Sequence, residues 1–130
     1  MEKKLSEAET QIMDLIWREG GYISSVTLAK RLEQHGMSWK RTTVSTFLSR
    51  LCDKGVLKAE RSGRSYSYTA LLTESEYLGA QAKGFVDSVY GGDAKGLVAA
   101  LIKNDYLSKS DIAELRDFWQ SGGGRDDGNA

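Results

Sequence analysis

Hydrophobic residues recur at helical spacing soon after the chain begins, and they predict a first helix of about four turns. The helix begins at a capping box, Ser6-Glu7-Ala8-Glu9, and we expect it to end at Gly20-Gly21. Its apolar positions are Ala8, Ile12, Leu15 and Ile16.

A short strand and a second helix are predicted next. Tyr22-Ile23 is long enough only for a small strand. Either Ser24 or Ser25 can cap the second helix, which should end near His35-Gly36. Its inner stripe is expected at Val26, Ala29 and Leu32.

The stretch SWKRTTVSTFLSRLCDKG, residues 38–55, predicts a third helix with two contrasting faces. Gly55 is placed to end it, while Ser38 and Thr42 both qualify as its cap. The apolar side consists of Val44, Phe47, Leu48 and Leu51. The opposite side consists of Thr42, Thr43, Ser45, Thr46, Ser49 and Arg50.

A β-hairpin is predicted after the third helix. Residues 58–61 and 65–69 alternate in polarity on either side of Ser62-Gly63, and Tyr66 and Tyr68 share one face of the second strand. Three helices followed by a hairpin is the order of a winged helix-turn-helix module. The expected fold is therefore mainly α with a small β-hairpin, and its winged-helix DNA-binding domain spans residues 1–71.

The second half of the chain predicts three further helices. They start at the capping box Thr73-Glu74-Ser75-Glu76, at Asp93 and at Ser108, and Gly91-Gly92 separates the first two. Because a bundle this small buries little alone, we expect residues 72–120 to form a helical dimerisation domain covered by a second copy. Residues 121–130 are expected to be a disordered tail. The dimerisation positions are Tyr77, Phe85, Val86, Val89, Leu97, Val98, Leu101, Ile102, Ile112, Leu115, Phe118 and Trp119.

The charge distribution adds information that the net charge of zero hides. Residues 1–70 carry 12 Lys and Arg against 8 Asp and Glu, whereas residues 71–130 carry 6 against 10. Residues 38–68 alone hold 7 basic residues and 2 acidic ones. This asymmetry indicates that the first half meets an anionic partner.

Candidate chemistry for an enzyme is sparse. His35 sits at a predicted helix end, Cys52 at the edge of an apolar stripe, and the glycines of residues 91–96 lack the spacing of a phosphate-binding loop. We therefore expect no catalytic residues, no metal site and no cofactor. The single cysteine, the absence of a long apolar run and a start without a signal-peptide core predict a soluble, cytoplasmic protein without direct membrane binding.

Double-stranded DNA fits the third helix better as a partner. A helix in the major groove needs short polar side chains near its N-terminus, and a wing needs basic ones. Lys40 and Arg41 either fix the phosphate register or read a base. An acidic protein that meets the same helix is the alternative partner. The other candidates are Thr42, Thr43, Ser45, Thr46, Arg50, Arg61 and Arg64.

Three segments resemble a known family. SEAETQIMDLIW, TVSTFLSRLCDKGVL and GRSYSYTA are similar to the first helix, the recognition helix and the wing of the penicillinase-repressor (BlaI/MecI/CopY) family, and the resemblance runs from about Leu5 to Trp119. It implies a homodimeric bacterial repressor that binds a palindromic operator through its winged helix and dimerises through its C-terminal helices. Thr43, Thr46 and Arg50 match the family's recognition helix, and Arg64 and Tyr66 match its wing. Tyr66 is therefore expected to contact DNA as well.

The chain departs from the family pattern in three places. Lys40-Arg41-Thr42 stands where members often carry Ser-Pro-Lys, which moves the basic charge by one residue. In β-lactam-responsive members a membrane sensor-protease acts upstream, and an Asn-Phe bond is cleaved where this chain has Ala100-Leu101. The C-terminal cysteine cluster of copper-responsive members is missing. The upstream sensor-protease stays a candidate partner, whereas metal sensing through that cluster is excluded.

Overall fold

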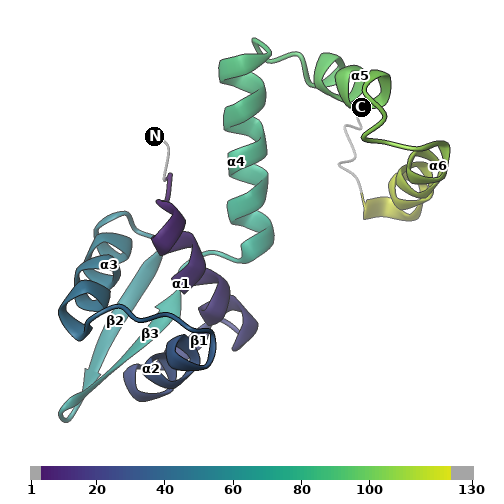
Figure 1. Ribbon diagram of the computed structural model, residues 1–130. Helices are drawn as coiled ribbons and strands as arrows, with labels where there is room; N and C mark the ends of the chain where they lie inside the picture. Colours follow the sequence, from purple (N-terminus) through teal and green to yellow (C-terminus); the bar gives the residue numbers. More distant parts are fainter. Residues whose placement is uncertain (1–3, 124–130) are drawn as a thin grey trace. The chain divides into compact units, whose positions relative to one another are not determined.

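The structure is a computed structural model that describes residues 4–123 (Figure 1). The disordered tail was predicted to begin at residue 121, but residues 121–123 belong to a turn that starts at Trp119. The part of the predicted tail from residue 124 onward lies outside the described residues. The elements are α1 Glu7–Arg18, β1 Tyr22–Ser24, α2 Ser25–Gln34, α3 Arg41–Asp53, β2 Leu57–Ser62, β3 Ser65–Ala70, α4 Glu74–Val89, α5 Ala94–Lys103, α6 Lys109–Phe118 and a π-helical turn Trp119–Gly123.

Side-chain caps begin the helices where the sequence places them. Ser6 and Glu9 form the predicted capping box of α1, and Ser24 rather than Ser25 caps α2. The starts of α4, α5 and α6 carry the predicted caps at Thr73, Asp93 and Ser108. Helix α3 differs, because its N-cap residue is Lys40 and no side chain caps it. The structure therefore rules out both Ser38 and Thr42 as the cap.

The three strands form an antiparallel sheet in the order β1-β3-β2. Ile23 pairs with Tyr68, which places the predicted small strand beside the hairpin. Ser62 pairs with Ser65, so the turn consists of Gly63-Arg64, one residue later than predicted. Gly63 has a φ of 64°, a conformation that an L side chain rarely adopts and that a tight hairpin turn requires.

The core of the first unit lies between α1, α2, α3 and the sheet. Ile12, Met13 and Ile16 of α1 are fully buried against Leu51 and Leu57. The predicted stripe of α2 was wrong at Val26 and Ala29 and right at Leu32. Leu28 and Leu32 are buried, one turn apart, whereas Val26 is 62% exposed and Ala29 is exposed.

An ion pair joins the start of α1 to the end of α3. The carboxylate of Glu9 is 1% exposed and accepts hydrogen bonds from Lys54 Nζ at 2.6 Å and from the Ser6 backbone N–H at 2.8 Å. Lys54 Nζ also donates to the carbonyl of Lys4 at 2.9 Å. Burial alone would raise the pKa of Glu9, but these hydrogen bonds and the Lys54 charge together lower it.

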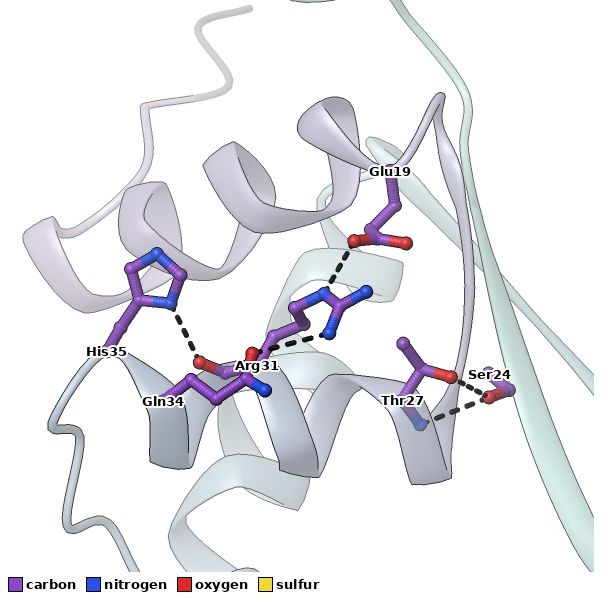
Figure 2. Close-up of polar contacts among 6 residues, drawn as sticks. All are labelled: Glu19, Ser24, Thr27, Arg31, Gln34 and His35. Atoms are coloured by element: carbon purple, nitrogen blue, oxygen red, sulfur yellow. Dashed lines mark hydrogen bonds and ion pairs between the residues drawn. The ribbon is translucent and has the colours of Figure 1, made fainter.

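A second polar cluster sets α2 against the end of α1. Figure 2 shows Arg31 reaching from α2 to Glu19, and its Nε donates to the carboxylate at 2.6 Å. The Ser24 hydroxyl lies at the other end of α2 and accepts from the Thr27 backbone N–H at 3.1 Å (Figure 2). The Arg31–Glu19 pair therefore joins α2 to the residue that ends α1, while the Ser24 contact lies within α2 itself.

The chain divides into two compact units between Ala82 and Lys83, within α4. Tyr77, at the start of α4, is 7% exposed and belongs to the core of the first unit, where its ring lies 5.6 Å from that of Trp17. Tyr77 was expected on the dimerisation surface, and its burial corrects that assignment. In the second unit, α5 and α6 have no fully buried side chain. Within residues 4–123, no helix is long and apolar enough to cross a membrane.

Candidate nucleic-acid interface

Helix α3 presents a polar face that matches the predicted one closely. Arg41, Thr42, Ser45 and Thr46 are exposed in its first two turns, and Arg50 is exposed further along. Thr43 is half-buried, at the edge of the face. Lys40 is exposed just before the helix begins. The result is a strip of short hydroxyl side chains with basic residues at both ends.

The opposite side of α3 fixes the strip in place. Leu48 and Leu51 are buried, and Val44 and Phe47 pack half-buried against the same core. Phe47 also meets the ring of Trp39 edge-on, with 5.2 Å between centroids. Trp39 is not among the residues predicted from the sequence, although an aromatic residue just before an amphipathic helix can indicate such a packing contact. Since α3 is held over its length, its polar face can meet a ligand with little rearrangement.

The N-terminus of α3 is suited to a phosphate oxygen. No side chain caps it, and its first turn contains no acidic residue. Its first N–H groups have no partner within the helix, and the helix dipole favours negative charge there. Lys40 and Arg41 add two formal positive charges at this point. Backbone and side chains therefore provide the same kind of attraction.

Thr46 is constrained by its own helix. Its hydroxyl donates a hydrogen bond to the Thr42 carbonyl, with 3.1 Å between the oxygens. The hydroxyl proton is therefore committed, which leaves the methyl group and the oxygen lone pairs for a ligand. This geometry suits a contact to a thymine methyl or to an amino group.

The β2–β3 hairpin projects beyond the helices of the first unit (Figure 1). Its turn holds Arg64, and Arg61 lies on β2 opposite Tyr66. Arg61 Nε donates to the Gly63 carbonyl at 3.0 Å, and its guanidinium carbon lies 5.8 Å from the centre of the Tyr66 ring. Tyr66 in turn stacks on Tyr68, with 6.4 Å between centroids. The shared face predicted for the two tyrosines is confirmed.

Two of the seven basic residues in this region are engaged elsewhere. Lys54 pairs with the buried Glu9, and Lys58 lies 3.4 Å from Glu60 on the exposed strand β2. Their charges are therefore partly balanced within the chain. The positive field over the polar face comes chiefly from Lys40, Arg41, Arg50, Arg61 and Arg64.

The apolar positions predicted for dimerisation lie open in the second unit, Tyr77 excepted. Those more than 40% exposed include Trp119 at 59% and Val89 at 60%. The half-buried ones are Val86, Leu97, Leu101 and Ile112, and the other exposed ones are Phe85, Val98, Ile102, Leu115 and Phe118.

The titratable groups near the core do not suggest reactive chemistry. Burial, together with the charge of Asp53, raises the pKa of Cys52, which favours the unreactive thiol. Burial also raises the pKa of Tyr68. Among residues 4–123, the structure contains no group of three His, Cys, Asp or Glu side chains that could hold a metal ion.

Comparison with known proteins adds to this geometry. The sequence profile of the family named Penicillinase repressor matches residues 5–121. The penicillinase repressor of Bacillus licheniformis is 32% identical over 112 residues, covering 86% of each chain. The methicillin resistance regulatory protein MecI of Mammaliicoccus sciuri is 28% identical over 115 residues, covering 88% of this chain and 92% of MecI. The solution structure of the DNA-binding domain of the repressor BlaI is similar with a TM-score of 0.51 and 33% identity, covering 58% of this chain and 89% of that domain.

Proposed function

The chain belongs to the penicillinase repressor family, and from this we propose that it is a DNA-binding transcriptional repressor acting as a homodimer on a palindromic operator. The relative from Bacillus licheniformis is named a penicillinase repressor and MecI a regulatory protein, and the chain is not an enzyme. The observation that carries the proposal is the α3 face of exposed hydroxyl and basic side chains, in a fold similar to a DNA-binding domain. We place the protein in the bacterial cytoplasm, where it has access to DNA.

In this proposal α3 lies in the major groove with its N-terminal half toward the bases. Thr42, Ser45 and Thr46 are short enough to let the backbone approach closely, and they supply the base contacts. Arg50 and the N-terminus of α3 contact phosphates. The wing extends toward the neighbouring backbone with Arg61 and Arg64.

The second unit supports the homodimer. Helices α5 and α6 contain no buried side chain, and at least six large apolar residues from Phe85 onward are exposed. Covering a half-exposed side chain of this size contributes about 1 kcal/mol, half of the value for full burial. Several such residues on each protomer supply a gross gain of the order needed to offset the cost of association. A second copy would cover the same face on both chains symmetrically.

Dimer symmetry implies an inverted repeat of half-sites. Binding one DNA molecule through two α3 helices raises the affinity far above that of a single half-site. A signal that separates the protomers would therefore release the DNA.

The proposal includes induction by an upstream membrane sensor-protease, and the support for this part is the family resemblance. Ala100-Leu101, which stands at the position of the cleaved bond in β-lactam-responsive members, lies inside α5, and both residues are half-buried. Cleavage there requires α5 to open locally, because a protease binds an extended chain.

Fluorescence anisotropy on DNA from the protein's own upstream region, with the salt concentration varied, tests the proposal. We expect specific binding with a steep salt dependence, because phosphate contacts release counterions. Sedimentation of the free and bound protein should give two protomers in each case. Binding to an acidic protein without DNA binding, or a monomer at micromolar concentration, would contradict the proposal.

A further inference from the structure

We propose that Tyr66 is a positioning residue for Arg61 rather than a DNA contact in its own right. The inference rests on the proposed DNA-binding function and assigns different tasks to the side chains of the wing. It follows from a stack of side chains that runs from the core of the first unit to the hairpin turn.

The stack has three layers. Tyr68 is half-buried and packs against the core. The Tyr66 ring lies on it with an angle of 19° between the ring planes. The guanidinium of Arg61 lies over the Tyr66 ring, within the distance at which a cation is attracted to an aromatic face. Each layer therefore rests on a better-held one.

A hydrogen bond fixes the remaining freedom of Arg61. Its Nε donates to the Gly63 carbonyl at 3.0 Å, so this donor is used inside the hairpin and the terminal nitrogens remain for a ligand. A free arginine loses substantial rotamer entropy when it binds a phosphate. Arg61 has lost part of that entropy before binding, which reduces the cost of the contact.

Arg64 gives an internal comparison. It lies in the turn itself, one residue after Gly63, and is exposed. The Tyr66 ring carries Arg61 and not Arg64. Replacing Tyr66 should therefore impair the contribution of Arg61 and leave that of Arg64 unchanged.

A double-mutant cycle on DNA tests the assignment. Arg61→Ala should weaken binding about tenfold for each half-site, the scale expected when one charge-assisted contact is lost there. Tyr66→Leu should weaken binding by about threefold to tenfold in the native background and by much less in the Arg61→Ala background. The loss of affinity in the double variant Tyr66→Leu with Arg64→Ala should equal the product of the two single losses. Tyr66→Phe keeps the ring and should bind within about twofold of the native protein.

Nuclear magnetic resonance of the free protein separates this inference from the proposed function. The side-chain protons of Arg61 should show an upfield ring-current shift in the native protein and in Tyr66→Phe, and the shift should disappear in Tyr66→Leu. Retained cross-strand contacts between β2 and β3 would show that the hairpin still folds.

Three results would overturn the inference while native binding persists. They are equal losses from Tyr66→Phe and Tyr66→Leu, independent losses from Arg61 and Tyr66, and a missing ring-current shift. Failure of the native protein to bind DNA would overturn the proposed function as well.

Discussion

The ion pair between Glu9 and Lys54 should be the most sensitive polar contact in the first unit. Replacing Lys54 with Met keeps most of the apolar stem and removes the charge. The Glu9 carboxylate then stays buried with the hydrogen bond from the Ser6 backbone N–H but without its cation. Glu9→Gln is the matched control, because the amide preserves the capping box and leaves no buried charge.

The expected magnitude follows from burial. Removing one partner of a fully buried pair costs about 3–5 kcal/mol, because the other charge stays uncompensated. Since 34% of the Lys54 side chain is exposed, water can replace part of the lost interaction, and we expect about 2–3 kcal/mol for Lys54→Met. Glu9→Gln should lower the free energy of unfolding by about 1 kcal/mol, because a weaker hydrogen bond to a neutral amide replaces the hydrogen bond to the carboxylate.

The effect should depend on pH in a defined direction. The folded pKa of Glu9 lies below its ordinary value, so the pair stabilises fully above the unfolded pKa of about 4.3 and less as pH falls through the folded pKa. In Lys54→Met the hydrogen bond and the charge that lower the pKa of Glu9 are lost, whereas the burial that raises this pKa remains. The difference in stability between Lys54→Met and the native protein should therefore shrink between neutral pH and about pH 3.

Urea unfolding followed by tryptophan fluorescence measures these values. A Trp119→Phe background leaves Trp17 and Trp39, which both lie in the first unit, as reporters. Equal stabilities of Lys54→Met and the native protein at neutral pH would refute the reasoning. A loss of stability that stays constant down to pH 3 would refute it too. Lys54→Met should also leave the salt dependence of DNA binding unchanged, since its charge serves the core.

Three further predictions concern α3 and α4. Arg50→Ala should lower the slope of log K against log salt by about one unit per half-site in anisotropy titrations, whereas Lys109→Ala in α6 should not change it. In selection from random DNA, Thr46→Val should keep the native base preference, because valine keeps the methyl group, whereas Thr46→Ser should lose that preference. If Thr46→Ser kept the preference and Thr46→Val lost it, the hydroxyl would be the group that reads the base. Gly79→Ala should stabilise α4 by about 1 kcal/mol, since an added Cβ meets nothing within 4 Å, and amide hydrogen exchange in α4 should slow.

Capping chemistry made most helix starts predictable from sequence. A capping residue fixes a boundary through local hydrogen bonds, so Ser6, Asp93 and Ser108 act where the sequence places them. The start of α3 was not predictable in this way, because Lys40 precedes it without a side-chain cap. That missing cap is one of the features that make the N-terminus of α3 suitable for binding an anion.

Positions decided by tertiary packing were harder to predict. In α2 the spacing of Val26, Ala29 and Leu32 is as helical as that of Leu28 and Leu32, and only the neighbouring elements decide which stripe is buried. Tyr77 was assigned to the dimerisation surface by its position in the chain, yet its ring packs beside Trp17 in the core of the first unit. A buried Glu9 cannot be recognised without Lys54, which lies 45 residues away in sequence.

The candidate site was largely predictable because it lies on one amphipathic helix. Exposure of Thr42, Ser45, Thr46 and Arg50 follows from burial of Leu48 and Leu51 at helical spacing. The wing was less predictable. A sequence pattern cannot show that Arg61 rests on Tyr66 while Arg64 does not.

Selection of bound sequences from random duplex DNA by the native protein tests the central claim most directly. We predict an enriched inverted repeat in which each half is read by the α3 helix of one protomer. A parallel selection with the Thr46→Ser variant should lose the preference at the base pairs that Thr46 contacts. Enrichment of a single, unrepeated half-site would contradict the homodimer. Recovery of no preferred sequence would contradict base recognition by α3.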